Sequence, residues 1–586
     1  MTISSLDKLY LRVAFFALCA IPALNNVHYD PQPQFWAEIS AAWAIIALFI
    51  FVLFRLPQQA IPLLIIPLAL FSLYLMLQPY LLISEYPGLT LVAALEMILC
   101  IFLACALCSI KTTYGISFVM RYLCYALLSG AILQSILGLI QYSGTMHYFG
   151  NLVFYDSVHP STNIFGHFGQ RNHYAHYLSW AIFGLIYLYT ERKIASIPFT
   201  ALVLWFSFSI TIAASRSVFI YFALALLICL IYHLRQRNQS TKRLVVAMGL
   251  ATLSLVTIEC CYPLVQNLFH QQHVIHSGLE RLSSENVTGR RAVEWTKAWL
   301  VFKANPLFGI GWNGFARQSI LLQPLFPNAA ANSGLFTNCH NLVLQLLAET
   351  GLVGCSIVFG GLGLIIYQML KKEHGAQASY TSENIILFCM IATTLAHSMN
   401  EYPLWYFYFL AIFISFLSLT TPVLILHGQT LLRLSSIPLL CLIYLILGNS
   451  IIFNRLVSYN DAPDKQAQFV AQARYLQDIA EHNLLWSYYG SYTLDNYINV
   501  DESASDRLYS LATQYKLTER LAHFHPYPDT MIKEAMLLWN LGQHNAAESV
   551  VGLALSAYPT YKSSFSETLL GEKYLPLRKL VSRKHQ

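Results

Sequence analysis

Charged residues are scarce in this chain of 586 residues. Asp, Glu, Lys and Arg together make up 11% of it, while hydrophobic residues make up 56%; a soluble protein carries about a quarter charged residues. This composition excludes an ordinary soluble domain and indicates a polytopic membrane protein. The net charge of +6 does not indicate a nucleic-acid partner, because the basic residues lie at the ends of apolar runs and form no patch.

Metal-binding patterns are also missing. The 12 cysteines are scattered through apolar runs without CxxC or histidine-rich spacing, which argues against a zinc site and predicts core cysteines. Cys339 and the adjacent Cys260 and Cys261 are exceptions, since they lie in or next to a long loop. If that loop faces an oxidising compartment, a disulfide there is an open alternative.

Apolar runs predict an all-α, polytopic membrane helix bundle of about thirteen spans. The first run has no small-residue cleavage site, so it is expected to remain as a helix and not to act as a signal peptide. The predicted spans are 9–25, 36–55, 60–83, 88–110, 116–141, 173–190, 196–214, 217–234, 244–262, 341–369, 384–400, 403–420 and 431–452.

Lysine and arginine predict the orientation, because they collect in alternate loops and cytoplasmic loops are rich in them. In a bacterial inner membrane, the opposite loops and the chain after about residue 453 would face the periplasm. We therefore expect four parts: membrane spans in 1–262, a large periplasmic loop in 263–340, further spans in 341–452 and a periplasmic helical domain in 453–586. The basic residues on the predicted cytoplasmic side are Lys8, Arg12, Arg55, Lys111, Arg192, Lys193, Arg235, Arg237, Lys242, Arg243, Lys371, Lys372 and Arg433.

The C-terminal part is polar and has helical periodicity. Trp539, the pair Leu541-Gly542 and the pair Ala546-Ala547 resemble a tetratricopeptide hairpin. A single unit of this kind predicts helices that pack on a partner or on the membrane domain, and not a catalytic role.

Four polar clusters lie beside predicted spans on one side of the membrane. Charged and polar groups are costly in or next to a span, so each cluster is expected to have a structural or functional role. The first contains Gln170, Arg171, Asn172 and His173 at the start of a span. The second is Arg216, between two spans with almost no loop; its planar guanidinium suits a phosphate. In both cases a helix cap or a side chain reaching the lipid headgroups is the alternative.

The third cluster is Arg290 and Arg291, which begin a predicted helix ended by Asn305-Pro306. Two tryptophans, Trp295 and Trp299, recur on it at helical spacing, so it is predicted to lie at the interface with its apolar face in lipid or on the bundle. Backbone N–H groups at a helix start favour anions, as the arginines do. A plain interfacial anchor is the alternative.

The fourth cluster is His397, Glu401 and Tyr402. A continuing helix would place His397 and Glu401 on one face, where they could position a proton acceptor or simply cap a broken helix. A further ionisable residue, His340, lies where the long loop meets an apolar helix.

Together these clusters predict an anionic, amphipathic ligand reached from the outer leaflet, such as a lipid-linked pyrophosphate. Arginines can stabilise a leaving pyrophosphate as a divalent ion would. No Asp-x-Asp pair lies on the predicted outer side, so no metal and no other cofactor is expected.

The motifs resemble those of the O-antigen ligase and polymerase superfamily. The residues that carry the resemblance are Arg216, Arg290, Pro306-Leu-Phe-Gly-Ile-Gly311 and His340-Asn-Leu-Val-Leu-Gln-Leu-Leu-Ala-Glu349-Thr-Gly351. The Gly169–His173 segment and the C-terminal extension are similar to those of the PglL-type bacterial O-oligosaccharyltransferases.

The resemblance implies a metal-independent, inverting membrane glycosyltransferase of the C type. It would transfer a glycan from undecaprenyl pyrophosphate to a serine or threonine of a periplasmic protein such as pilin. His340 would be the catalytic base. Arg216, Arg290, Arg171 and Arg291 would bind the pyrophosphate, and Gln170, Asn172, His173, His397, Glu401 and Tyr402 would position the substrates.

Three alternatives remain at this point. An O-antigen ligase or polymerase would use the same donor with a sugar acceptor. A transporter or flippase would place its charges along a path through the bilayer, whereas these gather on one face. A docking protein would leave the polar clusters unexplained.

Overall fold

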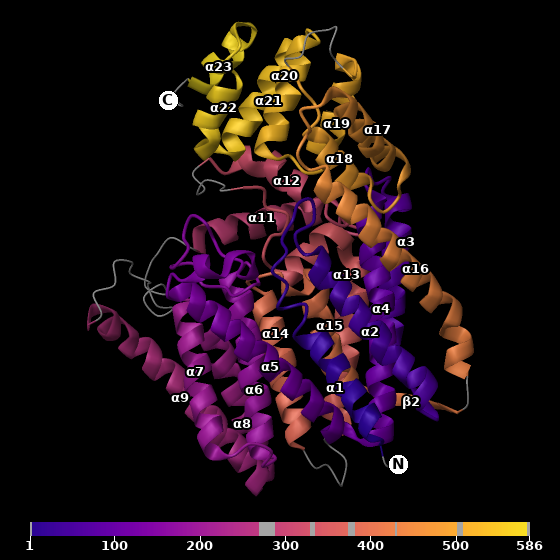
Figure 1. Cartoon of the computed structure of the whole chain (residues 1–586), viewed down its shortest axis with the longest axis vertical. Helices are drawn as coiled ribbons and strands as arrows, with labels where there is room; N and C mark the ends of the chain where they lie inside the picture. Colours follow the sequence, from indigo (N-terminus) through magenta and orange to yellow (C-terminus); the bar gives the residue numbers. More distant parts are fainter. Residues whose placement is uncertain are drawn as a thin grey trace.

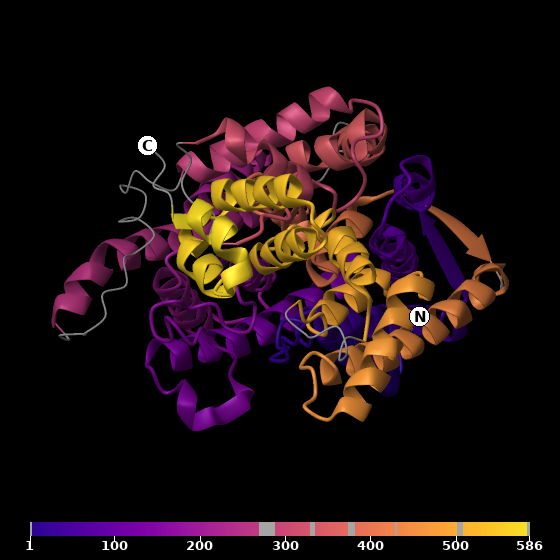
Figure 2. The ribbon, with the colours of Figure 1, turned by 90° about the horizontal axis from the view of Figure 1, so that it is seen from above.

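The computed structural model describes residues 3–268, 288–327, 334–372, 381–427, 430–500 and 508–582. A bundle of long helices forms the lower and middle part of the molecule in Figure 1, and the C-terminal helices, in orange and yellow, lie on its upper end. Figure 2 shows from above that the C-terminal helices cover the middle of the bundle. The architecture is all-α, apart from one short two-stranded sheet among the described residues.

A helix lies in each of the thirteen predicted spans. Seven of the described helices are long and apolar enough to cross a membrane, and α3, α7 and α15 are shorter apolar helices. The chain is thus a polytopic membrane protein, while the count of thirteen crossings stays a prediction. The bundle helices are α1 (Ser5–Cys19), α2 (Phe35–Arg55), α3 (Ile65–Leu81), α4 (Pro87–Tyr114), α5 (Ile116–Tyr142), α6 (Arg171–Thr190), α7 (Ser196–Ile212), α8 (Val218–Gln236), α9 (Gln239–Leu268), α13 (Leu342–Lys372), α14 (Ser382–Ser398), α15 (Phe407–Thr420) and α16 (Thr430–Ser458).

The span predicted for 60–83 begins later than expected. Strand β1 (Gln58–Pro62) pairs in antiparallel fashion with β2 (Val423–His427), and α3 starts only at Ile65. Pro57 precedes this strand and Pro62 is its last residue, and a proline disfavours helical conformation in the residue before it. The prolines therefore delay the helix.

Helix α6 lies inside the bundle, and nearly every residue from His173 to Thr190 is buried. A helix that is apolar all round is expected at such a place. Because α6 begins at Arg171, its interior position brings the first polar cluster to the upper end of the bundle, beneath the C-terminal helices (Figure 1).

The long loop contains α11 (Thr288–Ala304), α12 (Phe315–Leu322) and η2 (Gln323–Leu325). The predicted helix after Thr288 is confirmed. Its apolar side packs on the protein, since Ala298 and Val301 share a cluster with Ala348 of α13, while Trp299 is 42% exposed. The helix was expected to place its apolar face in lipid or on the bundle, and it packs at least part of that face on the bundle.

Two of the motif segments clasp each other through their backbones. Ile310 N and Gly311 N donate to Ala348 O and Glu349 O, and Leu352 N donates to Pro306 O at 2.8 Å. Gly351 has a φ of 62° and a ψ of −164°, a conformation essentially restricted to glycine. This clasp attaches the loop after α11 to the helix that follows His340.

Tyr74 and Gln78 of α3 add side-chain bonds to this clasp. The Tyr74 hydroxyl donates to Thr350 O at 2.8 Å, and Gln78 Nε2 donates to Glu349 O at 2.8 Å. Gln78 Oε1 accepts from Trp312 N. A polar pair inside an apolar helix thereby fixes the loop's position.

The C-terminal helices are α17 (Gln466–His482), α18 (Ser487–Asp495), α19 (Leu511–Ala522), α20 (Pro528–Asn540), α21 (His544–Ala557), α22 (Lys562–Thr568) and α23 (Leu575–Ser582), with the short η4 (Pro559–Tyr561) and η5 (Glu572–Tyr574). Helices α20 and α21 form the predicted hairpin, which turns at Gly542 with a φ of +80°. Its relation to tetratricopeptide repeats stays a prediction.

The C-terminal helices share a core with the long loop. Ile320 of α12 is buried among residues of α20, α21 and α23, and Leu335 packs against the same core. On another side, Arg520 donates to Glu85 O at 2.6 Å, and its guanidinium lies 4.5 Å from the centre of the Tyr86 ring. The C-terminal part therefore rests on both the loop and the top of α4.

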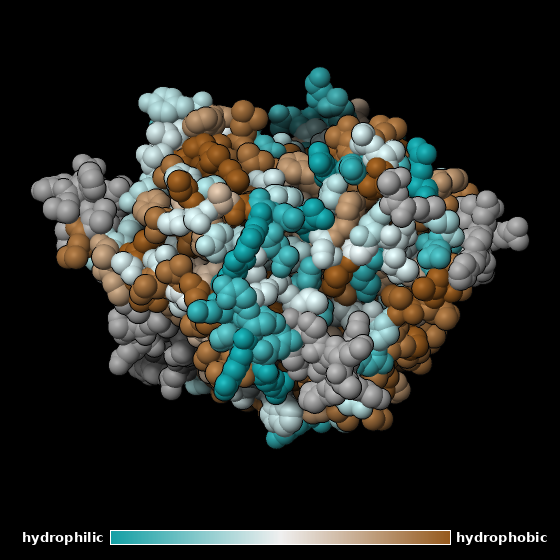
Figure 3. Space-filling view, turned by 90° about the horizontal axis from the view of Figure 1, so that it is seen from below, coloured by the Kyte–Doolittle hydropathy of each residue, from teal (hydrophilic) through white to brown (hydrophobic). Residues whose placement is uncertain are grey.

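The lower end of the molecule carries a band of hydrophilic side chains, drawn in teal in Figure 3, with hydrophobic surface on either side. Arg55, at the end of α2, lies 3.6 Å from the Asp7 carboxylate of α1. Helix ends in contact with water are expected to be polar in this way.

Cys260, Cys261 and Cys339 all carry free thiols.

Candidate active site

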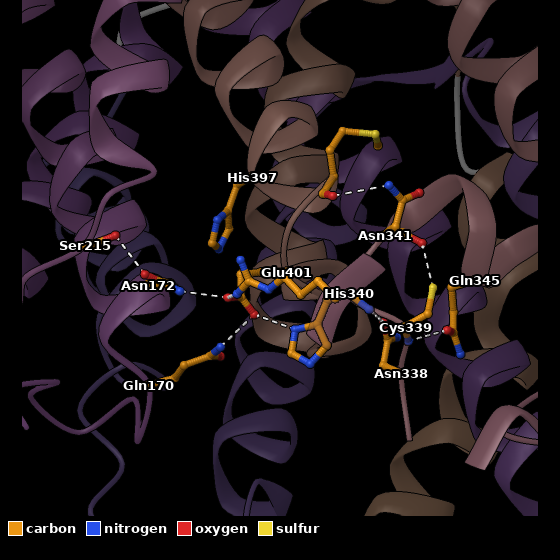
Figure 4. A network of polar contacts seen from close by, with 12 residues as sticks. Gln170, Asn172, Ser215, Asn338, Cys339, His340, Asn341, Gln345, His397 and Glu401 are labelled. Carbon is orange, nitrogen blue, oxygen red and sulfur yellow. Dashed lines mark hydrogen bonds and ion pairs between the residues drawn. The ribbon is translucent and has the colours of Figure 1, made fainter. Parts of the chain in front are cut away.

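The carboxylate of Glu401 joins the polar clusters. Its Oε2 accepts from Gln170 Nε2 at 2.9 Å and lies 2.9 Å from His340 Nδ1. Its Oε1 accepts from Asn172 Nδ2 at 2.7 Å and from a guanidinium nitrogen of Arg291. Figure 4 shows Gln170, Asn172 and His340 pointing toward Glu401 from separate segments. Residues far apart in the sequence thus meet at one buried anion.

The fourth cluster is built differently from the sequence prediction. Helix α14 ends at Ser398, and the backbone N–H groups of Asn400 and Glu401 close the turn on His397 O, each at 3.0 Å. The regular helix therefore ends before Glu401, although one helical hydrogen bond, from Glu401 N to His397 O, is kept, and the two side chains have other partners. His397 is buried, and its Nδ1 lies 2.5 Å from the Tyr221 hydroxyl.

Two buried glutamines of α5 hold the loop that carries Gln170. Gln141 Oε1 accepts from Phe165 N and Gly166 N, and Gln134 Oε1 accepts from His167 N at 3.0 Å. Gly166 is needed here, because it has a φ of +59° and a Cβ atom would lie 2.0 Å from Gln134 Oε1. The sequence signal for these supports was two amides in an otherwise apolar span.

The second cluster reaches the site through its serine. Ser215 Oγ donates to Asn172 Oδ1 at 2.8 Å, so Asn172 bridges Ser215 and Glu401. Ala214, with a φ of +55°, makes the tight turn that the short junction predicted. Arg216 follows directly in this turn and is partly buried.

His340 lies just before α13 in an unusual backbone conformation. Its φ is +59°, which is uncommon for a residue with a Cβ atom and often marks a functional site. Its N–H donates to Asn338 Oδ1, and the next residue, Asn341, accepts from Leu344 N at the start of the helix. The imidazole is 18% exposed, and no hydrogen bond joins its Nε2 to the described residues.

Tyr402 completes the surroundings of His340. Its ring centre lies 4.9 Å from that of His340, edge to face, and 5.7 Å from that of Tyr406. Burial raises the pKa of Tyr402, and the charge of Glu401 raises it further. The phenol is therefore protonated near neutral pH and can donate a hydrogen bond.

The two arginines of α11 have different partners. Arg290 pairs with Glu294 at 2.5 Å and lies over the Phe336 ring, 4.8 Å from its centre. Glu294 also binds the fully buried Lys297 at 2.9 Å. Arg291 instead turns toward Glu401. The sequence predicted that both arginines bind an anionic ligand. It did not predict their ion pairs with Glu294 and Glu401.

The remaining predicted residues lie around this centre. Arg171 is within electrostatic range of Asp156 in the preceding loop and makes none of the hydrogen bonds to Glu401. His173 is buried among rings, 5.0 Å from Tyr406 and 5.5 Å from His397 between ring centres. The structure thus brings Gln170, Asn172, Arg291, His340, Glu401 and Tyr402 together and places His173 and His397 one layer deeper.

Glu401 is ionised at the working pH of a cell. Burial alone would raise its pKa, but the hydrogen bond with His340 and the charge of Arg291 outweigh burial and hold the pKa well below its usual value. A fixed anion beside Nδ1 of a histidine favours the tautomer with hydrogen on that atom, which leaves Nε2 as a proton acceptor. The arrangement can therefore act as a general base next to arginines.

Comparison with known proteins supports the resemblance seen in the motifs. A family model described as "O-Antigen ligase" matches residues 201–359. A second, described as "Virulence factor membrane-bound polymerase, C-terminal", matches 385–569, and a third, "Protein glycosylation ligase", matches 164–189. All the residues gathered around Glu401 lie inside these ranges, so the chain resembles these families in the regions that contribute those residues.

Two curated relatives from Acinetobacter baylyi (strain ATCC 33305 / BD413 / ADP1) give a finer likeness. One is a "General O-oligosaccharyltransferase", 26% identical over 295 residues, which are 49% of this chain and 48% of that protein. The other is a "ComP-specific O-oligosaccharyltransferase", 28% identical over 246 residues, 41% of each chain. The chain thus spans about half the length of the curated relatives it matches, and the predicted resemblance to O-oligosaccharyltransferases is confirmed.

Proposed function

We propose that this protein is a membrane glycosyltransferase that attaches an oligosaccharide to proteins. The donor is a glycan on undecaprenyl pyrophosphate, and the acceptor is a serine or threonine hydroxyl of a periplasmic protein such as pilin. The enzyme would lie in the bacterial inner membrane with Glu401 and the C-terminal helices toward the periplasm. The pairing of His340 with the buried Glu401 is the observation that supports this most directly.

The acceptor hydroxyl would be activated by His340. A serine hydroxyl is a poor nucleophile near neutral pH, and a base within hydrogen-bond reach can take its proton as the oxygen attacks. Nε2 of His340 would accept this proton, while Glu401 on Nδ1 stabilises the imidazolium that forms. The oxygen–carbon bond forms as the anomeric carbon–pyrophosphate bond breaks, so a single displacement inverts the configuration.

Arginines would stabilise the leaving pyrophosphate. Arg291 binds Glu401 directly, and Arg216 follows Ser215, which donates to the Asn172 amide that binds Glu401. Guanidinium groups bind phosphate in a two-pronged geometry. Arg290 is held by Glu294, so we assign it a smaller share than the sequence motif implied. This role requires no divalent ion.

An O-antigen ligase, which transfers to a sugar, is the second candidate. The match of residues 201–359 to the O-antigen ligase model favours it, and it would use the same base and the same donor. The likeness to two O-oligosaccharyltransferases favours a protein acceptor.

The test is glycan transfer by the purified full-length protein in lipid nanodiscs, with an undecaprenyl-pyrophosphate glycan and two acceptors, a pilin and a lipopolysaccharide core. We expect transfer to pilin, detected by intact mass, and a loss of about 100-fold or more in His340→Ala. His482→Ala is the matched control, because His482 is an exposed histidine of α17 and should leave the rate unchanged. Transfer to the core alone would establish the ligase, and full activity of His340→Ala would remove His340 from the mechanism.

A further inference from the structure

The two arginines of α11 differ in how firmly they are held. The Arg290 side chain is 12% exposed, and its partner Glu294 is 1% exposed and also binds Lys297. The Arg291 side chain is 27% exposed, and its charged partner is Glu401. Arg291 is thus the arginine of this helix that can reach an incoming anion while remaining beside the catalytic histidine's partner.

The hydrogen bonds of Glu401 are divided between its two oxygens. Asn172 and Arg291 share Oε1, while Gln170 and His340 share Oε2. If Arg291 moved away, Oε1 would keep its bond to Asn172 and Oε2 would keep both of its bonds. The buried carboxylate would therefore keep three hydrogen-bond partners, which lowers the cost of losing Arg291.

We propose that Arg291 exchanges partners during each turnover, leaving Glu401 for the pyrophosphate of the bound donor. This inference rests on the proposed function and adds a regulatory step to it. A pyrophosphate carries more negative charge than one carboxylate and offers oxygens to a two-pronged guanidinium contact. The guanidinium is paired with an anion before and after the exchange, while the ionised Glu401 keeps its hydrogen bonds to Asn172, Gln170 and His340 and loses its cation.

The exchange would connect donor binding to base strength. While Arg291 is bound to Glu401, it neutralises part of the carboxylate's charge next to His340. Once Arg291 has turned to the pyrophosphate, the whole charge of Glu401 acts on Nδ1 of His340 and stabilises the imidazolium formed by proton transfer. His340 thus becomes a better base at the moment when the leaving group is in place.

Pyrophosphate binding provides a test that does not depend on activity. Inorganic pyrophosphate and undecaprenyl pyrophosphate are titrated separately into the full-length protein in nanodiscs by calorimetry. In Glu401→Gln the competing anion is gone, so we expect binding to become tighter by about tenfold or more, the value of a charge-assisted hydrogen bond, although glycan transfer falls. Arg291→Met should weaken binding, and Arg291→Met combined with Glu401→Gln should bind no better than Arg291→Met alone.

Two further variants guard the interpretation. Glu481→Gln makes the same change on the exposed surface of α17 and should leave both affinities unchanged. Glu401→Asp keeps the charge but shortens the side chain, so it should tighten pyrophosphate binding by less than Glu401→Gln. If thermal unfolding shows that Glu401→Gln does not fold, Glu401→Asp replaces it in the test.

The outcomes separate the two proposals. If folded Glu401→Gln and Glu401→Asp bind pyrophosphate no tighter than the natural protein, the exchange is refuted while the proposed function stands. If the natural protein binds neither compound, the donor assignment fails as well. Tighter binding of the inorganic compound alone would support the exchange but refute a lipid as the source of the anion.

Discussion

Gly309 lies against the backbone of Glu349 so closely that a Cβ atom on Gly309 would be 2.4 Å from the Glu349 carbonyl carbon. Gly351 meets the same clasp from the other side, where a Cβ atom would be 2.3 Å from Leu307 O. Neither contact can be relieved by turning a side chain, because both partners are backbone atoms. The clasp therefore depends on these two glycines.

The first prediction concerns this clasp. Gly351→Ala adds a clash to a backbone conformation that costs an L-residue roughly 1–3 kcal/mol, so we expect a destabilisation of about 3 kcal/mol or more and weak glycan transfer. Gly363→Ala in the same helix has no neighbour within 4 Å and should be neutral or slightly stabilising. Thermal unfolding of both variants checks this, and equal effects would show that the clasp is dispensable.

The second prediction concerns Asn172, which connects Ser215 to Glu401. Asn172→Asp replaces the amide donor by a carboxylate facing Glu401, and like charges at this distance repel. We expect Asn172→Asp to lower the rate of transfer by about tenfold more than Asn172→Ala, since the alanine only removes a bond worth roughly 1.5–3 kcal/mol. Ser215→Ala should have the smallest effect. An aspartate variant as active as the alanine variant would contradict the described contact.

The third prediction concerns the buried lysine of α11. Lys297→Met leaves Glu294 with one cation instead of two, and removing a partner from a buried ion pair typically costs about 3 kcal/mol. We expect that loss in the unfolding free energy, with local opening of α11 detectable by hydrogen exchange. Lys303→Met changes an exposed lysine of the same helix and should cost less than about 0.5 kcal/mol.

The fourth prediction concerns pH. Burial and the charge of Glu519 raise the pKa of Glu534 to about 7, from 4.5. The folded protein therefore binds this proton more tightly than the unfolded chain, and stability should fall as pH rises from about 4.5 to about 7. Glu534→Gln should flatten that fall, and at pH 8 it should be more stable than the natural protein by roughly 3 kcal/mol and unfold at a higher temperature. Proteolysis of the C-terminal helices against temperature at pH 5 and pH 8 measures it, and a parallel fall in the variant would assign the effect to another group.

Much of the bundle could be predicted from the sequence, because long apolar runs leave the backbone few ways to satisfy its hydrogen bonds in a membrane. The helices at 116–141 and 341–369 are confirmed almost to the residue, as α5 and α13. The error at the start of α3 arose where Pro57 and Pro62 allow a strand, whose partner β2 lies more than 350 residues away. Such long-range pairing leaves no local pattern.

The sequence predicted which residues gather around Glu401, but not which of them contact one another. Gln170, Asn172, Arg291, His340 and Glu401 were all selected because polar groups at span ends require a reason, and they do meet. Helical spacing from His397 to Glu401 was visible in the sequence, while the contact of Glu401 with His340 depends on how α13 and α14 pack. Gln134 and Gln141 were missed because their targets are backbone atoms of a loop, which carry no sequence signature.

Leu335 has a consequence for the design of hybrid enzymes. It lies five residues before His340 and packs against the core formed by α20, α21 and α23, so the loop before His340 and the C-terminal helices share one hydrophobic core. A chimaera joined near residue 453 would place foreign C-terminal helices against the native Leu335 and Ile320, and poor packing there would disturb the loop that leads to His340. Acceptor preference and catalytic rate would then change together, and exchanging residues 288–340 along with the C-terminal helices should let them be inherited as a unit.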